Sequence, residues 1–255
     1  MFDRFQNRIR IDATLAVESG LHIGAGEDSF QPTAINGAVL KNASGQPYIP
    51  GSSLKGVLRA YLAAVMDEPG KSSVTDSLGT KDDREKWKDN AKGDDKDMML
   101  AQHIEEQSTL TERLFGSQLM AGKVKISDAQ PAAAIRTEIR KGNAIDRDTH
   151  TVADKALFDT EFVPSGTIFS FRVDAENLTK DEAMVFLDLL DAFADSSITV
   201  GGRSRAGLGQ VRLDNCSYTV WKRIKGEFPK PQKAERDTVV PILFGSQSNA
   251  EVTYV

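Results

Sequence analysis

Apolar and polar side chains alternate between Arg8 and Val17, so that one face carries Ile9, Ile11, Ala13, Leu15 and Val17. This period of two predicts a strand with one buried face. The period changes at Ser53, where apolar residues begin to recur every three or four positions, at Leu54, Val57, Leu58, Tyr61, Leu62 and Val65. That spacing predicts a helix from Ser53 to Met66, which Ser52 or Ser53 can cap.

The second half of the chain repeats the order of strand and helix. Alternation at Phe169, Phe171 and Val173 predicts a strand within 162–173. Thr179 and Glu182 form a capping box for a helix that reaches Ala194, with a core stripe of Phe186, Leu189, Leu190 and Phe193. Shorter strands are expected at 124–126, 198–200 and 208–213. This order is typical of an α+β domain with helices on one face of a sheet.

Residues 67–109 interrupt this order as a charged insertion. The stretch Lys81–Asp97 holds 13 charged residues of both signs among 17, which favours a solvated helix or a disordered loop. We therefore expect one domain over 1–225 and a C-terminal tail over 226–255. Within the tail, the apolar run Val239–Phe244 is expected to dock on the domain or on a neighbour.

The composition is that of an ordinary globular protein of 255 residues, with 40% hydrophobic and 27% charged residues. The formal net charge of −5 argues at first against nucleic acid, but segregated basic patches can still bind phosphates. The single cysteine excludes an intrachain disulfide, fits a reducing compartment and gives no zinc spacing with the three histidines. Because the chain starts without a signal peptide and has no apolar run near ~20 residues, we expect a cytoplasmic protein with no membrane partner and no structural zinc.

A first basic segment, Pro50–Arg59, has the sequence PGSSLKGVLR at the start of the first predicted helix. A helix N-terminus presents unpaired N–H groups and a partial positive charge. Ser52 and Ser53 add hydroxyl groups, and Lys55 and Arg59 add two cations, so the segment is a candidate phosphate-binding site. It does not match the nucleotide P-loop pattern. A simple capped helix remains the alternative.

A second basic segment, Gly201–Gly209, holds four glycines and the two arginines Arg203 and Arg205 between predicted strands. Glycines let a backbone approach a ligand closely, and arginines bind phosphates and stack on bases. A flexible hairpin tip is the alternative, although a tip needs fewer glycines. The pattern therefore favours RNA binding.

A third basic stretch covers 136–150 and contributes Arg136, Arg140 and Lys141, followed by Arg147. Proteins that bind single-stranded nucleic acid use basic grooves of this kind. Its acidic residues, Glu138, Asp146 and Asp148, leave a solvated hairpin as an equal possibility.

These motifs together resemble one family. The segments LHIGAGED, IPGSSLKG followed by an arginine, LFG at 114–116, RTEIRKGNAIDRDTHTVADKALFDTEFVPSGTIF and GGRSRAGLGQV occur in the order found in backbone subunits of type III CRISPR effector complexes. These Cas7-like subunits, of the Csm and Cmr kinds, belong to the RAMP superfamily. The resemblance covers nearly the whole chain apart from 67–109 and the tail.

The resemblance implies a modified ferredoxin-like fold, related to the RNA-recognition fold, whose copies stack along the CRISPR RNA. It implies target RNA and other type III subunits as further partners. A β-hairpin thumb that displaces bases of the guide–target duplex maps to about Gly142–Phe158, within a thumb region at about 136–160. Guide contacts map to Ser52, Ser53, Lys55, Arg59 and Arg136, and to Arg203 and Arg205 in the glycine loop.

The resemblance also implies a catalytic aspartate for cleavage of target RNA, but its position falls on Asn36. An asparagine can act neither as a general base nor as an anionic metal ligand. Three interpretations stay open: an engineered inactivation, a naturally silent subunit, or a nearby acid, Glu27 or Asp28, serving instead. Where cleavage occurs, Mg²⁺ or another divalent cation is the expected cofactor.

Two other functions compete with this one. A stand-alone endoribonuclease that processes the CRISPR transcript would rely on general acid–base chemistry by histidine, tyrosine or lysine. His22 and His150 are the only histidines outside the insertion, and neither has an obvious partner in the sequence. A protein-only scaffold would leave the two segments rich in glycine and basic residues unexplained.

Overall fold

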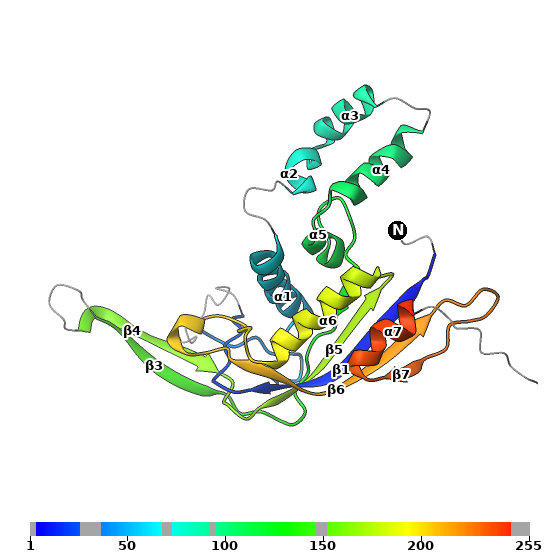
Figure 1. Cartoon of the computed structure of the whole chain (residues 1–255). Coiled ribbons are helices and arrows are strands. Elements are labelled where there is room, and N and C mark those ends of the chain that lie inside the picture. The colour runs from blue at the N-terminus through cyan, green and yellow to red at the C-terminus, as the bar shows by residue number, and fades with distance from the viewer. Residues whose placement is uncertain (1–3, 26–36, 68–72, 92–94, 146–151, 246–255) are drawn as a thin grey trace, which may run out of the picture.

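The computed structural model describes residues 4–25, 37–67, 73–91, 95–145 and 152–245, with the backbone alone for 143–145 and 152–158. Its main sheet has five strands in the order β2-β5-β1-β6-β7, and each is antiparallel to its neighbours. These strands are β1 (Asn7–Val17), β2 (Val124–Ile126), β5 (Ile168–Glu176), β6 (Val211–Lys222) and β7 (Gln232–Ala234). Helices α1 (Gly51–Met66) and α6 (Lys180–Ala194) lie on one side of the sheet (Figure 1). The expected α+β class is confirmed.

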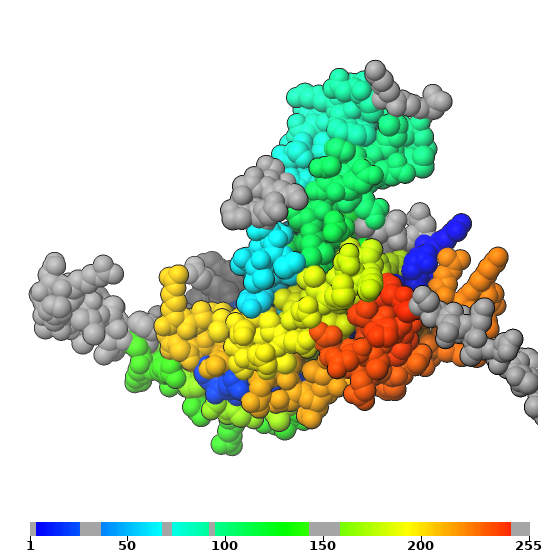
Figure 2. All heavy atoms as spheres, in the orientation of Figure 1, coloured from blue at the N-terminus to red at the C-terminus, as the bar shows by residue number. Residues whose placement is uncertain are grey.

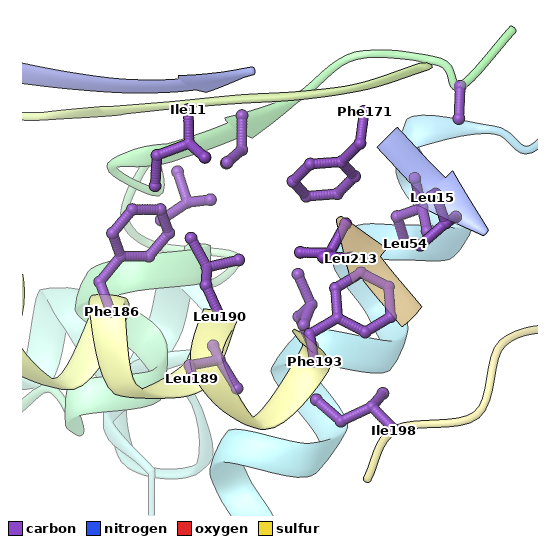
Figure 3. Packing of buried hydrophobic residues seen from close by; sticks show 14 of the residues in the cluster. Ile11, Leu15, Leu54, Phe171, Phe186, Leu189, Leu190, Phe193, Ile198 and Leu213 are labelled. Carbon is purple, nitrogen blue, oxygen red and sulfur yellow. The ribbon is translucent and has the colours of Figure 1, made fainter. Parts of the chain in front are cut away.

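The strand β1 lies at the centre of the sheet because its alternation buries one whole face. Ile11 pairs in register with Val173 on β5 and with Tyr218 on β6. Figure 3 shows side chains of these strands packed against the apolar stripe of α6. The rings of Phe171 and Phe193 meet edge to face with centroids 5.8 Å apart. Burial of this shared apolar surface holds the helices on the sheet.

The other face of the sheet is polar and carries ion pairs between neighbouring strands. On β1 and β5, the ion pairs are Arg8 with Glu176 at 2.6 Å, Arg10 with Asp174 at 2.9 Å, and Asp12 with Arg172 at 2.6 Å. In each pair the two residues stand opposite each other in the register. The cations Arg8, Arg10 and Arg172 are therefore neutralised within the sheet.

The capping box predicted at the start of α6 is present. Thr179 Oγ1 accepts a hydrogen bond from the N–H of Glu182, whose carboxylate accepts one from the N–H of Thr179. The Glu182 side chain is 2% exposed and also accepts from Lys123 Nζ at 2.7 Å and from Arg113 Nε at 3.1 Å. Burial alone would raise the pKa of Glu182, but the Lys123 ammonium and the Thr179 N–H together hold that pKa below its usual value.

The charged insertion folds into short helices that rise above the main body (Figure 2). They are α2 (Val74–Leu78), α3 (Lys81–Asn90) and α4 (Lys96–Gln107), and α5 (Leu110–Phe115) leads back to the sheet. The expected solvated helix is α3, which buries none of its residues. The rest differs from a disordered loop, because Val74, Leu78 and Leu100 form a second, small hydrophobic cluster. Trp87 and His103 stack beside it with ring centroids 4.9 Å apart.

Strands β3 (Glu138–Ile145) and β4 (Val152–Phe162) form a separate antiparallel hairpin. Figure 1 shows this hairpin extending from the same end of the molecule as the loop that follows α6. The third basic stretch therefore leaves the main sheet as a two-stranded excursion.

Several local predictions are wrong. The segment 198–200 makes only an isolated bridge, between Thr199 and Gln210, and β6 begins at Val211 and runs on to Lys222. Val65 was assigned to the buried stripe of the first helix, but it is 62% exposed. Met66, the last residue of that helix, is likewise exposed.

The apolar run of the tail docks on the domain. Val239 and Leu243 of α7 (Val239–Phe244) are buried in the main core. Just before α7, Arg236 contacts Asp188 and Asp191 on α6, at 2.7 and 2.6 Å. Together with β7, these contacts join the segment after Gly226 to the same sheet and core. Within the described ranges, no helix is long and apolar enough to cross a membrane.

Candidate nucleic-acid interface

The first basic segment forms the start of α1, but neither Ser52 nor Ser53 caps the helix. The N-cap residue is Pro50, and no side chain of the cap accepts a hydrogen bond. Instead Asp128 Oδ1 accepts from the N–H of Gly51 at 2.8 Å. A Cβ on Gly51 would lie 2.2 Å from the carbonyl oxygen of Ile126, so only glycine fits here. The first amide of the helix thus already donates a hydrogen bond to a carboxylate, so any phosphate contact would be made by residues further along the helix.

Lys55 and Arg59, one turn apart on α1, line an open hollow of about 630 Å³. Its other walls come from the insertion and the loop after α5, namely Ser73, Thr75, Phe115, Gly116, Ser117, Gln118, Met120, Ala121 and Gly122. Burial and the positive charge of Arg59 both lower the pKa of Lys55. Within the described ranges neither cation makes an ion pair. Two adjacent unpaired cations create a positive potential that attracts an anion.

The loop at 116–122 forms one wall of this hollow because two glycines let its ends touch. Gly116 has a φ of +90°, and a Cβ on it would lie 2.7 Å from the nitrogen of Gly122. The N–H of Ser117 donates to the carbonyl of Met120 at 2.8 Å. Sequence reasoning did not assign Ser117 or Thr75 to the site. The only signal was the short LFG motif that ends at Gly116.

The glycine loop packs against the segment around His22. A Cβ on Gly201, whose φ is +83°, would lie 2.4 Å from the carbonyl oxygen of His22. The N–H of Gly202 donates to that same oxygen at 2.9 Å. Beyond this contact, Arg203 takes a left-handed conformation and Arg205 lies in a short 3-10 helix, with both side chains exposed. The close glycine contact fixes the base of a loop that presents two arginines.

Two of the basic elements meet at Gly37. Its carbonyl accepts from the N–H of Glu161, near the end of β4, at 2.9 Å. A Cβ on Gly37 would lie 3.7 Å from a guanidinium nitrogen of Arg203. Gly37 directly follows Asn36, which lies outside the described residues, as do Glu27 and Asp28. Gly37 itself therefore lies beside the base of the hairpin and the arginine of the glycine loop.

Glu161 connects these elements through a buried carboxylate. It accepts hydrogen bonds from the N–H of Val39 at 2.9 Å, from Lys41 Nζ at 2.6 Å and from Thr137 Oγ1 at 2.5 Å. Burial would raise the pKa of Glu161, but the Lys41 ammonium and the Thr137 hydroxyl reverse that effect and lower the pKa. His22 Nδ1 donates to the backbone carbonyl of Glu161 at 2.8 Å. No periodic pattern in the sequence indicated this network.

The hairpin carries the remaining basic candidates. The Arg140 guanidinium lies over the ring of Phe162, 5.1 Å from its centroid, and Lys141 stands opposite Asp159 in the register. Arg136 is exposed beside an open hollow before β3. Arg147 lies outside the described residues. Arg140 and Lys141 thus stand near the base of the hairpin, close to where Glu161 holds Gly37.

The part of the chain that the structure describes holds no group of three or more acidic, histidine or cysteine side chains that could bind a metal ion. The acids that could serve a divalent cation near position 36, Glu27 and Asp28, lie outside those ranges. Among the described residues, the candidate interface is thus built from cations, glycine backbone and two structural carboxylates, Asp128 and Glu161.

Comparison with known proteins decides the family. The model of the RAMP superfamily matches residues 14–212, from β1 to the start of β6. The chain belongs to the RAMP superfamily. This match contains α1, the hairpin and the glycine loop, whereas most of β6, β7 and α7 lie beyond it.

Three relatives of this RAMP protein share one name. The chain is 27% identical over 235 residues to the CRISPR system Cms endoribonuclease Csm3 of Streptococcus thermophilus, and the matched stretch covers 83% of this chain and 90% of that protein. Proteins of the same name from Enterococcus italicus and Methanothermobacter thermautotrophicus match shorter parts. The first is 43% identical over 58 residues, 22% of this chain and 27% of the relative. The second is 35% identical over 65 residues, which are 25% of this chain and 26% of the relative.

Proposed function

We propose that this chain is a CRISPR RNA-binding backbone subunit of a type III effector complex. In this proposal its copies stack along the guide, together with other subunits, and position target RNA for cleavage at regular intervals. The observation that carries the proposal is the RAMP match over 14–212, joined by relatives named as Csm3 endoribonucleases. The basic hollow and the glycine loop supply the chemistry that phosphate binding needs.

The proposal includes a ferredoxin-like core. Apart from the insertion, the short helix α5 and the hairpin, the chain runs through β1, α1, β2, β5, α6 and β6 before it reaches β7 and α7, and β5 lies between β1 and β2. Strand, helix, strand, strand, helix, strand in this arrangement supports a split βαβ fold. We assign the β3–β4 hairpin as the thumb. Its first and last residues, Glu138 and Phe162, make it longer than the segment Gly142–Phe158 expected from the resemblance.

Guide binding in this proposal uses basic side chains at two places. Lys55 and Arg59 face the hollow beside α1, and Arg203 and Arg205 extend from the glycine loop. Ser52 and Ser53 lie in the first turn of α1 next to the same cations. Phosphate contacts of this kind set the register of a protein on RNA and make binding depend on salt.

Cleavage in this proposal depends on position 36. A carboxylate there, or Glu27 or Asp28 in its place, would supply the anionic ligand for Mg²⁺ or another divalent cation. The cation would stabilise charge at the cleaved phosphate. The network of Glu161 supports a positioning role, because it holds Gly37, the next residue in the chain.

A stand-alone processing endoribonuclease is less well supported. The RAMP superfamily match and the name of the relatives favour the backbone subunit. His22, a possible general acid for that alternative, is 8% exposed and its Nδ1 is bound to the carbonyl of Glu161. A buried histidine held in this way serves the packing of the loop base.

The experiment is purification of the tagged chain from cells that express the CRISPR array and the partner subunits. We expect RNA of defined length to co-purify, and the double variant Lys55→Gln, Arg59→Gln to retain several-fold less of it. A double variant of two exposed lysines, Lys81→Gln and Lys86→Gln, is the control with the same change in charge. Equal RNA recovery from both variants would contradict the assigned guide contacts. A chain that is free of RNA and cuts repeat RNA alone would establish the alternative.

A further inference from the structure

The turn between β6 and β7 concentrates positive charge at the end of the molecule away from the hairpin. The turn and the adjoining strand ends, residues 222–233, hold five basic side chains, Lys222, Arg223, Lys225, Lys230 and Lys233, and one acidic side chain, Glu227. The whole chain carries a formal net charge of −5. Figure 1 shows this turn extending beyond the sheet on the side opposite the β3–β4 hairpin.

An aromatic ring stands among these cations. Phe228 is 93% exposed, and Ile224 close by is 47% exposed. Phe228 lines an open hollow of about 470 Å³ together with Arg4, Phe5 and Arg223. A second hollow, of about 590 Å³, also contains Arg223 and adds Lys222 and Lys225. Arg223 thus borders both hollows, and the exposed ring of Phe228 lines the first of them.

Several arginines elsewhere on the surface are paired with acids, as Arg236 is with Asp191 and Arg212 with Asp214. Among the described residues, Arg4, Arg223, Lys225 and Lys230 make no ion pair. Because the cluster holds one acid, Glu227, against these basic side chains, it carries a net positive charge that attracts an anionic partner.

We propose that the β6–β7 turn binds single-stranded RNA, with the phosphates at Arg223, Lys225 and Lys230 and a base stacked on Phe228. Basic grooves with exposed aromatic side chains bind single strands in this way and tolerate any base sequence. Pro229 and Pro231 restrict the backbone beside the ring, which lowers the entropy lost on binding. The turn lies outside the family match at 14–212, so this contact is separate from the proposed guide-binding elements.

RNA fits this surface better than an acidic protein does. A stable protein interface needs about 800 Å² per partner with a contiguous apolar centre. The turn offers one fully exposed ring and one half-exposed isoleucine, surrounded by cations. Such a surface suits a flexible polyanion that has flat, stackable groups.

The test is fluorescence anisotropy of a labelled 20-nucleotide oligouridine RNA with the full chain, titrated over a range of KCl concentrations. The triple variant Arg223→Gln, Lys225→Gln, Lys230→Gln should bind more weakly, and its slope of log affinity against log salt should be less negative by about 2. Phe228→Ala should weaken binding roughly 5- to 150-fold with little change in that slope. The control is Lys81→Gln, Lys86→Gln, Lys180→Gln, which removes the same charge from other exposed sites.

The outcomes separate this inference from the proposed function. Weaker binding by both turn variants, with the control unchanged, would support it. It would be overturned if the turn variants bound RNA like the unmodified chain, or if the control lost as much affinity as the triple variant. Unchanged RNA binding with an altered oligomeric mass would assign the turn to protein contacts and overturn it too. Lys55→Gln, Arg59→Gln in the same assay reports on the guide site independently.

Discussion

Replacing Glu161 by glutamine tests whether its carboxylate anchors the chain that leaves position 36. The carboxylate is shared by three donors, the Val39 N–H, the Lys41 ammonium and the Thr137 hydroxyl. Glutamine keeps the size of the side chain but has a single acceptor oxygen and adds an NH₂ group. In either orientation of the amide, at least one of the three donors faces another donor.

The contacts set the size of the effect. The Glu161 side chain is 6% exposed, so a lost charge-assisted hydrogen bond there is worth about 1.5–3 kcal/mol. Lys41 is 40% exposed, so in the variant its ammonium can be solvated by water. Solvent screening therefore limits how much the loss of the Lys41 contact lowers the free energy of unfolding. The Val39 N–H is buried, and leaving it unsatisfied costs about 1–3 kcal/mol. We expect Glu161→Gln to lower the free energy of unfolding by about 3 kcal/mol.

Urea denaturation of the full chain measures this change, with Glu138→Gln as the matched control. Glu138 is exposed on β3, so its substitution should change the free energy by less than about 0.5 kcal/mol. The fold lowers the pKa of Glu161. Its contribution to the free energy of unfolding is therefore complete above the pKa of the unfolded chain, about 4.3, and is lost as the pH falls through the lower pKa of the folded chain. The difference between the variant and the unmodified chain should therefore shrink below about pH 4. An unfolding free energy of Glu161→Gln that matches the control at pH 7 would refute the anchoring role.

Two further predictions follow from buried charge and from position 36. Glu182→Gln should destabilise the chain by about 3–5 kcal/mol in urea denaturation, because it leaves the Lys123 ammonium buried without its counter-charge. The double variant Glu182→Leu, Lys123→Met should recover much of that loss, and a double variant as unstable as the single one would argue against the charge explanation. Asn36→Asp should produce metal-dependent cleavage of guide-matched RNA at regular spacing, measured on sequencing gels. No gain of cleavage by a complex that still binds target would rule out position 36 as the cleavage site.

The sequence predicted those elements whose burial repeats with a fixed period. β1, α1 and α6 each place one face on the core, so their apolar residues recur every two or every three to four positions. The capping box of Thr179 and Glu182 was also predictable, because its partners are three residues apart. Local patterns of this kind predicted the elements, although Val65 at the end of the α1 stripe is exposed.

The site was less predictable, because its contacts join residues that are far apart in the chain. Asp128 caps α1 from 77 residues away, and Glu161 binds Val39 across 122 residues. Glycine and arginine content indicated the loop at 201–209, but not that Gly201 packs on the carbonyl of His22. The small core of the insertion likewise depends on Leu100 folding back on Val74, which charge composition does not reveal.

The lengths of the outer strands limit how copies of this protein can associate. The two edge strands of the main sheet, β2 and β7, have three residues each. Pro231 directly precedes β7 and lacks the N–H that a further strand would need. Long unpaired edges are templates for uncontrolled growth of a sheet from one molecule to the next, and short edges with proline prevent it. In the proposed stack along a guide, copies would therefore associate through side chains or RNA rather than by extending the main sheet from one molecule to the next.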